Sequence, residues 1–418
     1  MARRSPGSPA TDAERQIADL LRTAKESLRL SVAFLSRLDG EAQHLEVVEA
    51  SGPASLFFRA GVTQKQETTF CQAILDGRLP AVIPDVARNA VARSLPSARI
   101  PRIRSYVSVP VRLSDGTLYG TFCAAGLTSD QGLTERDRAL MEVLAKAAAV
   151  VLEPGIRDRE RREVIESRLL PLMRDHRGPV VVYQPIVELA TGRRVGAEAL
   201  SRFPAEWEVP PDVAFAEAHS VGLGPELELL ALRRAAEAVD EVTGYVAMNV
   251  SPATLVTADC LDLLVGLPLD RVLLELSEHD PVEDYQTLQA ALDPLRRAGM
   301  RLAIDDVGAG FSSLRHIVQT HPDVIKLDRT IVDGVSDDDV LTTLVRSLVA
   351  FAAGAGARVV AEGVETAADA GWLRELGVDH GQGWYFGRPG PLGDLVGGAV
   401  LPSAPSPAVS RSGGRPAR

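Results

Sequence analysis

Two adjacent aspartates, Asp305 and Asp306, directly follow an apolar run in the segment RLAIDDVGAGFSSL at residues 301–314. Neighbouring anions repel each other, and an apolar setting disfavours both charges. A turn with a helix cap would explain the pair, because Asp and Ser favour such positions. A divalent cation held by both carboxylates is the alternative, and the rest of the chain has to distinguish the two.

The pair belongs to a series of short apolar runs in the C-terminal half of the chain, each followed by polar residues. Helical patterns lie between most of the runs, and this alternation indicates a parallel sheet covered on its outer face. Eight such units in residues 163–398 match the size of a (β/α)8 barrel of the TIM type. The runs are 180–187, 194–202, 244–250, 271–278, 301–306, 323–328, 358–365 and 380–386.

The first two runs depart from this pattern, because only the short segment ELATGRR, with a turn at Thr191 and Gly192, lies between them. A parallel crossover needs a dozen residues or more, whereas a short turn joins antiparallel strands. The sequence therefore predicts a modified α/β barrel whose first strand is antiparallel to the others.

The ends of the runs carry the residues that could do chemistry, since the carboxyl ends of barrel strands meet at one face. Six carboxylates at one mouth would repel strongly unless cations were bound. A set of oxygen ligands without His or Cys favours Mg²⁺ or Mn²⁺ over zinc. The residues are Glu198, Asn249, Glu275, Asp305, Asp306, Lys326, Asp328, Glu362 and Gln382.

The aspartate pair then has a simple interpretation: one aspartate bridges two metal ions, and the other completes the second site. Two ions about 4 Å apart stabilise both the attacking and the leaving oxygen of a phosphoryl displacement. Lys326 suits a point charge beside the reacting water or phosphate. The chain has 45 basic residues, of which four are lysines, so a surface role for Lys326 is disfavoured.

These residues lie in motifs that resemble those of EAL-domain cyclic-di-GMP phosphodiesterases. The motifs occur in the family's order over about residues 163–398. They are YQPIVELATGRRVGAEALSRF, NVSP, ELSE, DDVGAGFSSL, IKLD, AEGVE and GQGWYFGRP. The resemblance implies hydrolysis of cyclic di-GMP to linear pGpG with two Mg²⁺ or Mn²⁺ ions per site, usually in a homodimer.

The resemblance also implies a role for individual residues. The matching metal ligands are Glu198, Asn249, Glu275 and Asp305 for one ion, and Asp305, Asp306 and Asp328 for the other. Among the matching catalytic residues, Glu362 is a general base acting through water, and Lys326 and Gln382 orient that water. Glu278 steadies the loop after Asp306, and Glu365 lies behind the site. The matching substrate contacts are Gln184, Leu200 and Arg202, and an arginine suits a bidentate hold on phosphate.

Three positions differ from the usual family pattern. Ser201 replaces an apolar residue, Ser277 replaces a threonine, and Val307 stands where phenylalanine is common. We expect these differences to affect rate and regulation and to leave the type of reaction unchanged.

The N-terminal part, residues 14–153, is predicted to be an α+β domain, with strands in the middle and helices at both ends on one face. A helix over Glu14–Leu28 begins it, a hairpin turns around Ser114–Gly116, and Pro154-Gly155 ends the closing helix. The stretches TFCQAILDGRLPAVIPDVARN and YVSVPVRLSDGTLYGTFCAAG resemble a GAF sensory domain. Cys71 is expected to be a buried core cysteine, in preference to a bilin or redox attachment site.

The remaining segments complete the predicted organisation: a disordered start at 1–13, a charged linker at 154–162 and a disordered tail at 399–418. The net charge of −11 argues against a DNA-binding protein. No apolar run is long enough to span a bilayer, and three scattered cysteines favour the cytoplasm.

Three functions remain open from the sequence. The leading hypothesis is an active phosphodiesterase regulated by an unknown small-molecule or protein signal at its N-terminal domain. The alternatives are a catalytically silent cyclic-di-GMP receptor and an unrelated metal-dependent barrel enzyme acting on a small organic acid. A receptor is free to lose metal ligands, and this sequence keeps all of them.

Overall fold

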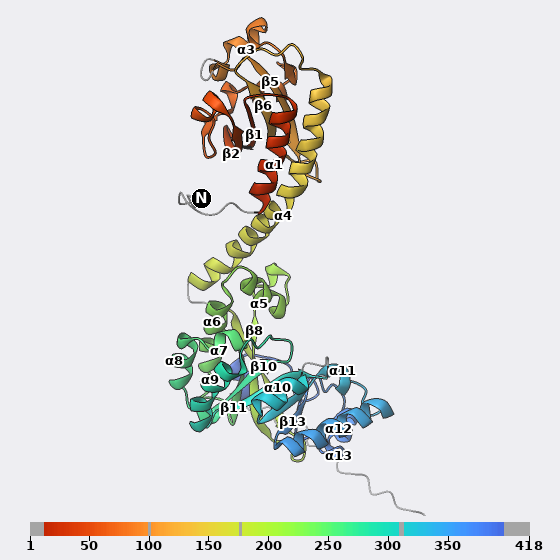
Figure 1. Cartoon of the computed structure of the whole chain (residues 1–418). Coiled ribbons are helices and arrows are strands. Elements are labelled where there is room, and N and C mark those ends of the chain that lie inside the picture. The colour runs from red at the N-terminus through yellow and green to blue at the C-terminus, as the bar shows by residue number, and fades with distance from the viewer. Residues whose placement is uncertain (1–11, 99–101, 175–177, 309–312, 397–418) are drawn as a thin grey trace, which may run out of the picture. The chain divides into compact units, whose positions relative to one another are not determined.

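The computed structural model describes residues 12–98, 102–174, 178–308 and 313–396, and it contains two compact units (Figure 1). Unit 1 is Met1–Arg162 and unit 2 is Glu163–Arg418. The predicted disordered ends lie outside the described residues, except that Asp12 and Ala13 belong to the first helix.

Unit 1 is built on an antiparallel sheet with the strand order β3-β2-β1-β6-β5-β4 in the part of the chain described. The predicted hairpin around Ser114–Gly116 is confirmed, because β5 and β6 pair antiparallel across it. The strands are β1 (Val32–Asp39), β2 (Ala42–Ala50), β3 (Thr63–Lys65), β4 (Val82–Ile83), β5 (Ser105–Arg112) and β6 (Leu118–Gly126).

Helices lie on both faces of this sheet, so the prediction of helices on one face is wrong. The long helices α1 (Asp12–Ser27) and α4 (Glu135–Arg174) pack on one face, while α2 (Phe70–Leu75) and α3 (Ala90–Ser94) contribute to the core on the other. The strands allow this because neighbouring residues face opposite sides, and both sides are apolar: Phe122 joins one core and Cys123 the other.

The predicted end of the closing helix at Pro154-Gly155 is wrong, because helix α4 runs through both residues and is 40 residues long in all. A proline inside a helix removes one hydrogen bond and crowds the preceding turn. Here the helix is buried on both sides of the proline: Met141 and Ala148 pack in the core of unit 1, and Leu169 packs in the core of unit 2. Of the described helices, α4 included, none is long and apolar enough to cross a membrane.

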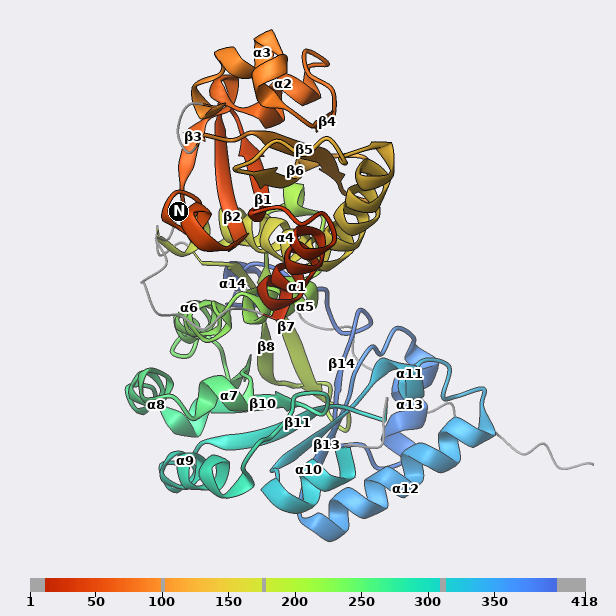
Figure 2. The same ribbon diagram turned by 45° about the horizontal axis from the view of Figure 1, so that its top comes forward.

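Unit 2 is a closed barrel with the strand order β10-β11-β12-β13-β14-β7-β8-β9 in the described residues (Figure 2). Strand β7 pairs antiparallel with both of its neighbours, and the other pairs are parallel, which confirms the predicted inverted first strand. The strands are β7 (Val180–Glu188), β8 (Arg194–Arg202), β9 (Tyr245–Asn249), β10 (Val272–Ser277), β11 (Arg301–Val307), β12 (Val324–Leu327), β13 (Arg358–Ala361) and β14 (His380–Gln382).

Helices surround the barrel and bury the outward side of its strands in one large core (Figure 2). They are α5 (Pro211–Ser220), α6 (Gly224–Ala236), α7 (Pro252–Leu255), α8 (Ala258–Val265), α9 (Tyr285–Arg297), α10 (Ser313–Thr320), α11 (Arg329–Val332), α12 (Asp339–Ala355), α13 (Ala367–Glu375) and α14 (Leu392–Val396).

Inside the barrel the layers change from apolar to charged along the strands. The apolar layer includes Ala247, Leu273, Ala303, Val324 and Val360. Side chains on one face of a strand recur every second residue. The position two residues beyond each of these is polar in every case, namely Asn249, Glu275, Asp305, Lys326 and Glu362. The strand period thus brings the predicted residues to one mouth.

Candidate metal and catalytic site

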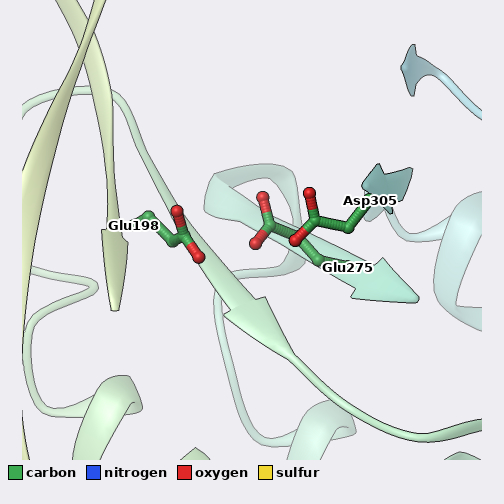
Figure 3. A group of neighbouring side chains, drawn as sticks. All are labelled: Glu198, Glu275 and Asp305. Carbon is green, nitrogen blue, oxygen red and sulfur yellow. The ribbon is translucent and has the colours of Figure 1, made fainter. Parts of the chain in front are cut away.

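Three carboxylates from three strands meet at this mouth and point toward one another (Figure 3). Glu198 comes from β8, Glu275 from β10 and Asp305 from β11. One carboxylate oxygen of each residue lies within 4.8 Å of the corresponding oxygens of the other two, and all three residues are buried. Three buried anions at this spacing are arranged as ligands of one cation.

A second group of carboxylates shares Asp305 with the first and adds Asp306 and Glu362, again with oxygens within 4.8 Å. Consecutive strand residues normally face opposite sides, but the pairing of β11 with β12 is irregular between Ile304 and Val307. Asp306 has φ of +60°, in the left-handed region that Asp tolerates better than most residues. This bulge lets two adjacent aspartates reach the same site.

The ammonium of Lys326 lies among four of these carboxylates and is 1% exposed. Its Nζ is 2.6 Å from Glu362 Oε1, 3.0 Å from Glu275 Oε1 and 3.1 Å from Asp305 Oδ2. Glu198 Oε2 is farther away, at 3.5 Å. Among the described residues, no other basic side chain forms an ion pair with these four carboxylates. Lys326 is therefore the counter-charge of the cluster.

Two amides hold Glu198, and a third continues the chain of hydrogen bonds. Gln382 Nε2 donates to Glu198 Oε2 at 2.6 Å and to Gln184 Oε1 at 3.1 Å. Asn249 Nδ2 donates to Glu198 Oε1 at 3.1 Å. Gln184 Nε2 in turn donates to the backbone oxygen of Gly387 at 3.0 Å. Predicted residues from β7, β8, β9 and β14 are thus joined at the mouth.

Burial sets the protonation of this cluster. Burial raises the pKa of Glu275, of Asp305 and of Glu362, and the neighbouring carboxylates raise it further against the opposing charge of Lys326. Burial and Asp305 raise the pKa of Asp306 to about 6. Burial alone would raise the pKa of Glu198, but Lys326 and two amides lower it instead. Without a metal ion, the charged forms of Glu275, Asp305 and Glu362 are therefore disfavoured relative to those of exposed carboxyl groups.

The donor set fits a hard divalent cation. Glu275 Oε2 is buried and has no hydrogen-bond partner in the described structure, and Oε1 is met only by the Lys326 ammonium at 3.0 Å. Buried polar groups are otherwise almost always hydrogen-bonded, so such oxygens indicate a missing partner. Oxygen ligands alone suit Mg²⁺ or Mn²⁺. Glu198, Glu275, Asp305, Asp306 and Glu362 could hold such ions.

Metal affinity should rise with pH. A cation must displace the protons that the raised pKa values retain, and fewer protons remain at pH 8 than at pH 6. We expect the apparent Kd for Mg²⁺ to fall by at least about tenfold between these values, with proton release on binding at pH 6. Isothermal titration in two buffers of different ionisation enthalpy measures both. Equal Kd values and buffer-independent heats would contradict the protonation assigned to the cluster.

Three other predicted residues lie around this centre. Asp328 is half-buried at the end of β12, accepts a hydrogen bond from Thr330 N at 2.9 Å and raises the pKa of Asp306 by its charge. Glu278 is 1% exposed, and its backbone N donates to Asp305 O at 3.2 Å. Glu365 forms an ion pair with Arg329 at 2.9 Å and belongs to neither of the two carboxylate groups in the described structure.

Two of the three predicted substrate contacts lie beyond Glu198 on β8, and the third, Gln184, is on β7. Leu200 and Arg202 follow Glu198 at intervals of two, so they share its face toward the rim. Arg202 is half-buried and donates to Ser201 O at 2.8 Å. The sequence did not single out Trp384, which follows Gln382 closely, is 52% exposed and lies 4.2 Å below the guanidinium of Arg388.

The three positions that differ from the family pattern are also defined. Ser277 Oγ accepts from His279 N at 3.2 Å, as a threonine hydroxyl could. Val307 is 1% exposed in the core at the end of β11. Ser201 is half-buried beside Arg202. The glycine-containing loop that Glu278 is predicted to steady falls partly outside the described residues, at 309–312.

Glu278→Ala should lower turnover by at least about tenfold, because groups that orient metal ligands typically tune a site by 10–100-fold. The two oxygens of Glu278 are buried without a hydrogen-bond partner in the described structure, and Oε1 lies 3.7 Å from His279 Nε2. Glu278→Gln keeps the size and one carbonyl oxygen, and it should be less impaired. Steady-state kcat and Mg²⁺ affinity are the measurements. Wild-type values of both in Glu278→Ala would reduce Glu278 to a rim residue.

Comparison with known proteins agrees with this architecture. Residues 169–389 match the family model of the EAL domain, and residues 10–153 match that of a GAF domain. The structure of EAL enzyme Bd1971 in its cGMP-bound form has a TM-score of 0.51 and 20% sequence identity, and the match covers 88% of this chain and 92% of that one. That likeness concerns the fold alone.

Two curated relatives match about half of this chain. The uncharacterized protein Rv1354c of Mycobacterium tuberculosis (strain H37Rv) is 37% identical over 227 residues, which are 50% of this chain and 36% of the relative. The probable cyclic di-GMP phosphodiesterase PdeN of Escherichia coli (strain K12) is 34% identical over 239 residues, which are 54% of this chain and 46% of PdeN. The matches thus span less than half of either relative.

Proposed function

Since the chain belongs to the EAL domain family and carries a GAF domain before it, we propose that it hydrolyses cyclic di-GMP to linear pGpG with bound Mg²⁺ or Mn²⁺. The observation that carries this proposal is the pair of carboxylate groups that share Asp305. The family resemblance assigns Glu198, Asn249, Glu275 and Asp305 to one ion, and Asp305, Asp306 and Asp328 to the other. In the structure the second group has Glu362 beside Asp305 and Asp306. The name of the relative PdeN supports the same substrate.

When bound, the metal ions supply positive charge that stabilises the charge developing on the phosphodiester. The chain provides the remaining functions. Arg202 at the rim suits a bidentate hold on a phosphate. The Gln184 amide is already bonded to Gly387 and Gln382, so in this proposal it contacts the ligand while keeping part of that network.

Glu362 is the candidate general base. Water attacks phosphorus, the bond from phosphorus to O3′ breaks, and Glu362 accepts a proton of the attacking water. O3′ takes a proton from solvent and leaves as the 3′-hydroxyl of pGpG. Lys326 Nζ, 2.6 Å from Glu362 Oε1, orients this carboxylate and the water beside it. Gln382 fixes Glu198 from the opposite side of the mouth. Holding the reacting groups in this way accounts for much of such catalysis.

The test is incubation of the full chain with cyclic di-GMP and Mg²⁺, followed by chromatographic detection of pGpG. Steady accumulation of pGpG that stops on addition of EDTA and resumes with excess Mg²⁺ supports the proposal. Saturable binding of cyclic di-GMP without any pGpG between pH 6 and pH 9 would instead indicate the silent receptor. Neither binding nor turnover would favour a different substrate for the barrel.

We further propose that the active protein is a cytoplasmic homodimer and that unit 1 adjusts the rate in response to a signal. Both proposals rest on the family resemblance. Light scattering of the eluting protein measures the oligomeric state, and the kcat of the full chain is compared with that of residues 163–418. A monomer with full activity would overturn the first proposal, and equal kcat values with every signal tried would count against the second.

A further inference from the structure

Two cysteines of unit 1 lie with their sulfur atoms close together. Cys71 is on helix α2 and Cys123 is on strand β6, and their Sγ atoms are 3.3 Å apart. Both are free thiols, and neither is more than 1% exposed. Because a disulfide has an S–S distance of about 2.05 Å, the two atoms need to approach by only about 1.2 Å. Such a shift is within the reach of side-chain rotation.

The surroundings of these sulfurs are polar, although the helix and strand belong to an apolar core. Gln43 Nε2 donates to Cys71 Sγ at 3.0 Å, and the Tyr106 hydroxyl lies 3.0 Å from the same atom. Ser108 Oγ lies 3.2 Å from Cys123 Sγ. A cysteine that only fills a core behaves as a small apolar residue and needs no such partners. Donors that converge on a sulfur stabilise its thiolate.

The two thiols are not equivalent. Burial alone would raise the pKa of Cys71, but hydrogen bonds from Cys123, Thr121, Tyr106 and Gln43 outweigh it and lower the pKa to about 6. Burial and Cys71 raise the pKa of Cys123 well above its ordinary value. The thiolate is the nucleophile, and both the direction of these shifts and the position of Cys71 in the wall of a cavity assign the attack to Cys71.

Access is also unequal. A cavity of about 150 Å³ is lined by Cys71 and by aromatic side chains that include Phe34, Phe58 and Tyr106, and Cys123 is not among its lining residues. Phe57, also in its wall, is 48% exposed, so the cavity reaches the surface of unit 1. The volume exceeds that of several water molecules at about 30 Å³ each. Its lining is mixed, with the polar side chains of Gln43, Gln64 and Thr69 beside the aromatic ones.

We propose that Cys71 and Cys123 form a dithiol site that reduces a small hydroperoxide and closes into an intramolecular disulfide. The reactive thiol defines the substrate class, and the cavity lined by Cys71 has room for hydrogen peroxide or a compact alkyl hydroperoxide. The polar neighbours hold the thiolate, and the second thiol waits behind it.

The chemistry takes two steps. The Cys71 thiolate attacks the terminal oxygen of ROOH, an S–O bond forms, the O–O bond breaks, and RO⁻ takes a proton and leaves as ROH. Cys71 is now a sulfenic acid. The sulfur of Cys123 then attacks the sulfur of Cys71, an S–S bond forms, the S–O bond breaks, and hydroxide leaves as water with the proton of Cys123. The peroxide is reduced by two electrons, and the dithiol is oxidised by two.

The experiment uses the reduced full chain, treated with one equivalent of hydrogen peroxide or of tert-butyl hydroperoxide. Remaining thiols are blocked under denaturing conditions, and peptides are identified by mass spectrometry. We expect a peptide linked through Cys71 and Cys123 as the main product, while Cys260 remains a blocked free thiol. Cys260 is the internal control, because burial raises its pKa to about 12. The ratio of rates between the two oxidants identifies the preferred peroxide.

Three variants separate the roles of the thiols and of their neighbour. Cys123→Ser should stop at a sulfenic acid on Cys71 that dimedone traps, and Cys71→Ser should leave Cys123 unlabelled. Tyr106→Phe removes one hydrogen bond and should slow oxidation of Cys71 by roughly three- to tenfold. Oxidation of Cys71 no faster than that of Cys260, or equal labelling of Cys123 in Cys71→Ser, would overturn the proposal. None of these readouts depends on hydrolysis of cyclic di-GMP.

Discussion

Asp305→Asn is expected to lower the kcat for cyclic di-GMP hydrolysis by at least about a hundredfold, because metal charge stabilisation is worth several kcal/mol in such reactions. Asp305 offers an oxygen to both carboxylate groups, so its replacement weakens both. An amide has the same shape but no charge. Arg202 and Gln184 are unchanged, and substrate affinity should therefore survive in part. The measurement is kcat at saturating Mg²⁺, with binding of cyclic di-GMP measured in parallel.

The same substitution should not destabilise the metal-free protein. Burial and the neighbouring Glu198 raise the pKa of Asp305, which shows that its charge is disfavoured there. Removing a disfavoured charge at a functional site leaves stability equal or higher, so the melting temperature without metal is the second readout. Asp293→Asn, on the exposed side of α9, is the matched control and should keep full activity. Wild-type kcat in Asp305→Asn would refute the shared-ligand role.

The barrel could be predicted from the sequence because its signals are local. Alternating apolar runs and helical segments indicate strands and crossovers. The short connection at Thr191-Gly192 was sufficient to predict that β7 is antiparallel to β8. The end of α4 could not be predicted in the same way. Pro154 is a local signal for a helix end, while the burial of Leu169 beyond it depends on tertiary contacts.

The site follows the same division. Period-two spacing within strands brought Glu275 and Asp305 to the mouth, and this needed only the strand assignments. The position of Lys326 among four carboxylates depends on barrel closure, which brings β12 close to strands distant in the sequence, such as β8. The pairing of Glu365 with Arg329 likewise depends on how the loop after β13 packs against α11. No sequence pattern contains such distances.

The polar surroundings of Cys71 show the limit of composition as a guide. The prediction of a buried cysteine is confirmed, since Cys71 is 1% exposed on α2. Its partners Tyr106 and Cys123 lie 35 and 52 residues away along the chain, on two strands of the sheet. Only pairing of β5 with β6 brings them to the same sulfur. Burial could be predicted locally, but chemical environment could not.

Lys326→Met should destabilise the metal-free protein by about 3 kcal/mol at pH 8, because losing one partner of a buried ion pair leaves uncompensated charge. The loss should be smaller at pH 6. Glu275, Asp305 and Glu362 have raised pKa values, so the folded state binds more protons than the unfolded state, and stability falls as pH rises. Without Lys326 these pKa values rise further and the slope steepens. Urea unfolding of both proteins at pH 6 and pH 8, with EDTA present, measures the free energy of unfolding and its change with pH.

Lys326→Arg separates charge from shape. A guanidinium keeps the positive charge, so the unfolding free energy at pH 8 should lie closer to wild type than that of Lys326→Met. It is planar and wider than an ammonium, and its fork favours bidentate partners, so it would be drawn to one carboxylate of the four. A misplacement of about 1 Å can cost roughly a hundredfold, and we expect kcat to fall by at least about tenfold. Equal kcat values for Lys326→Arg and wild type at saturating Mg²⁺ would remove Lys326 from the catalytic set and leave it as a counter-charge alone.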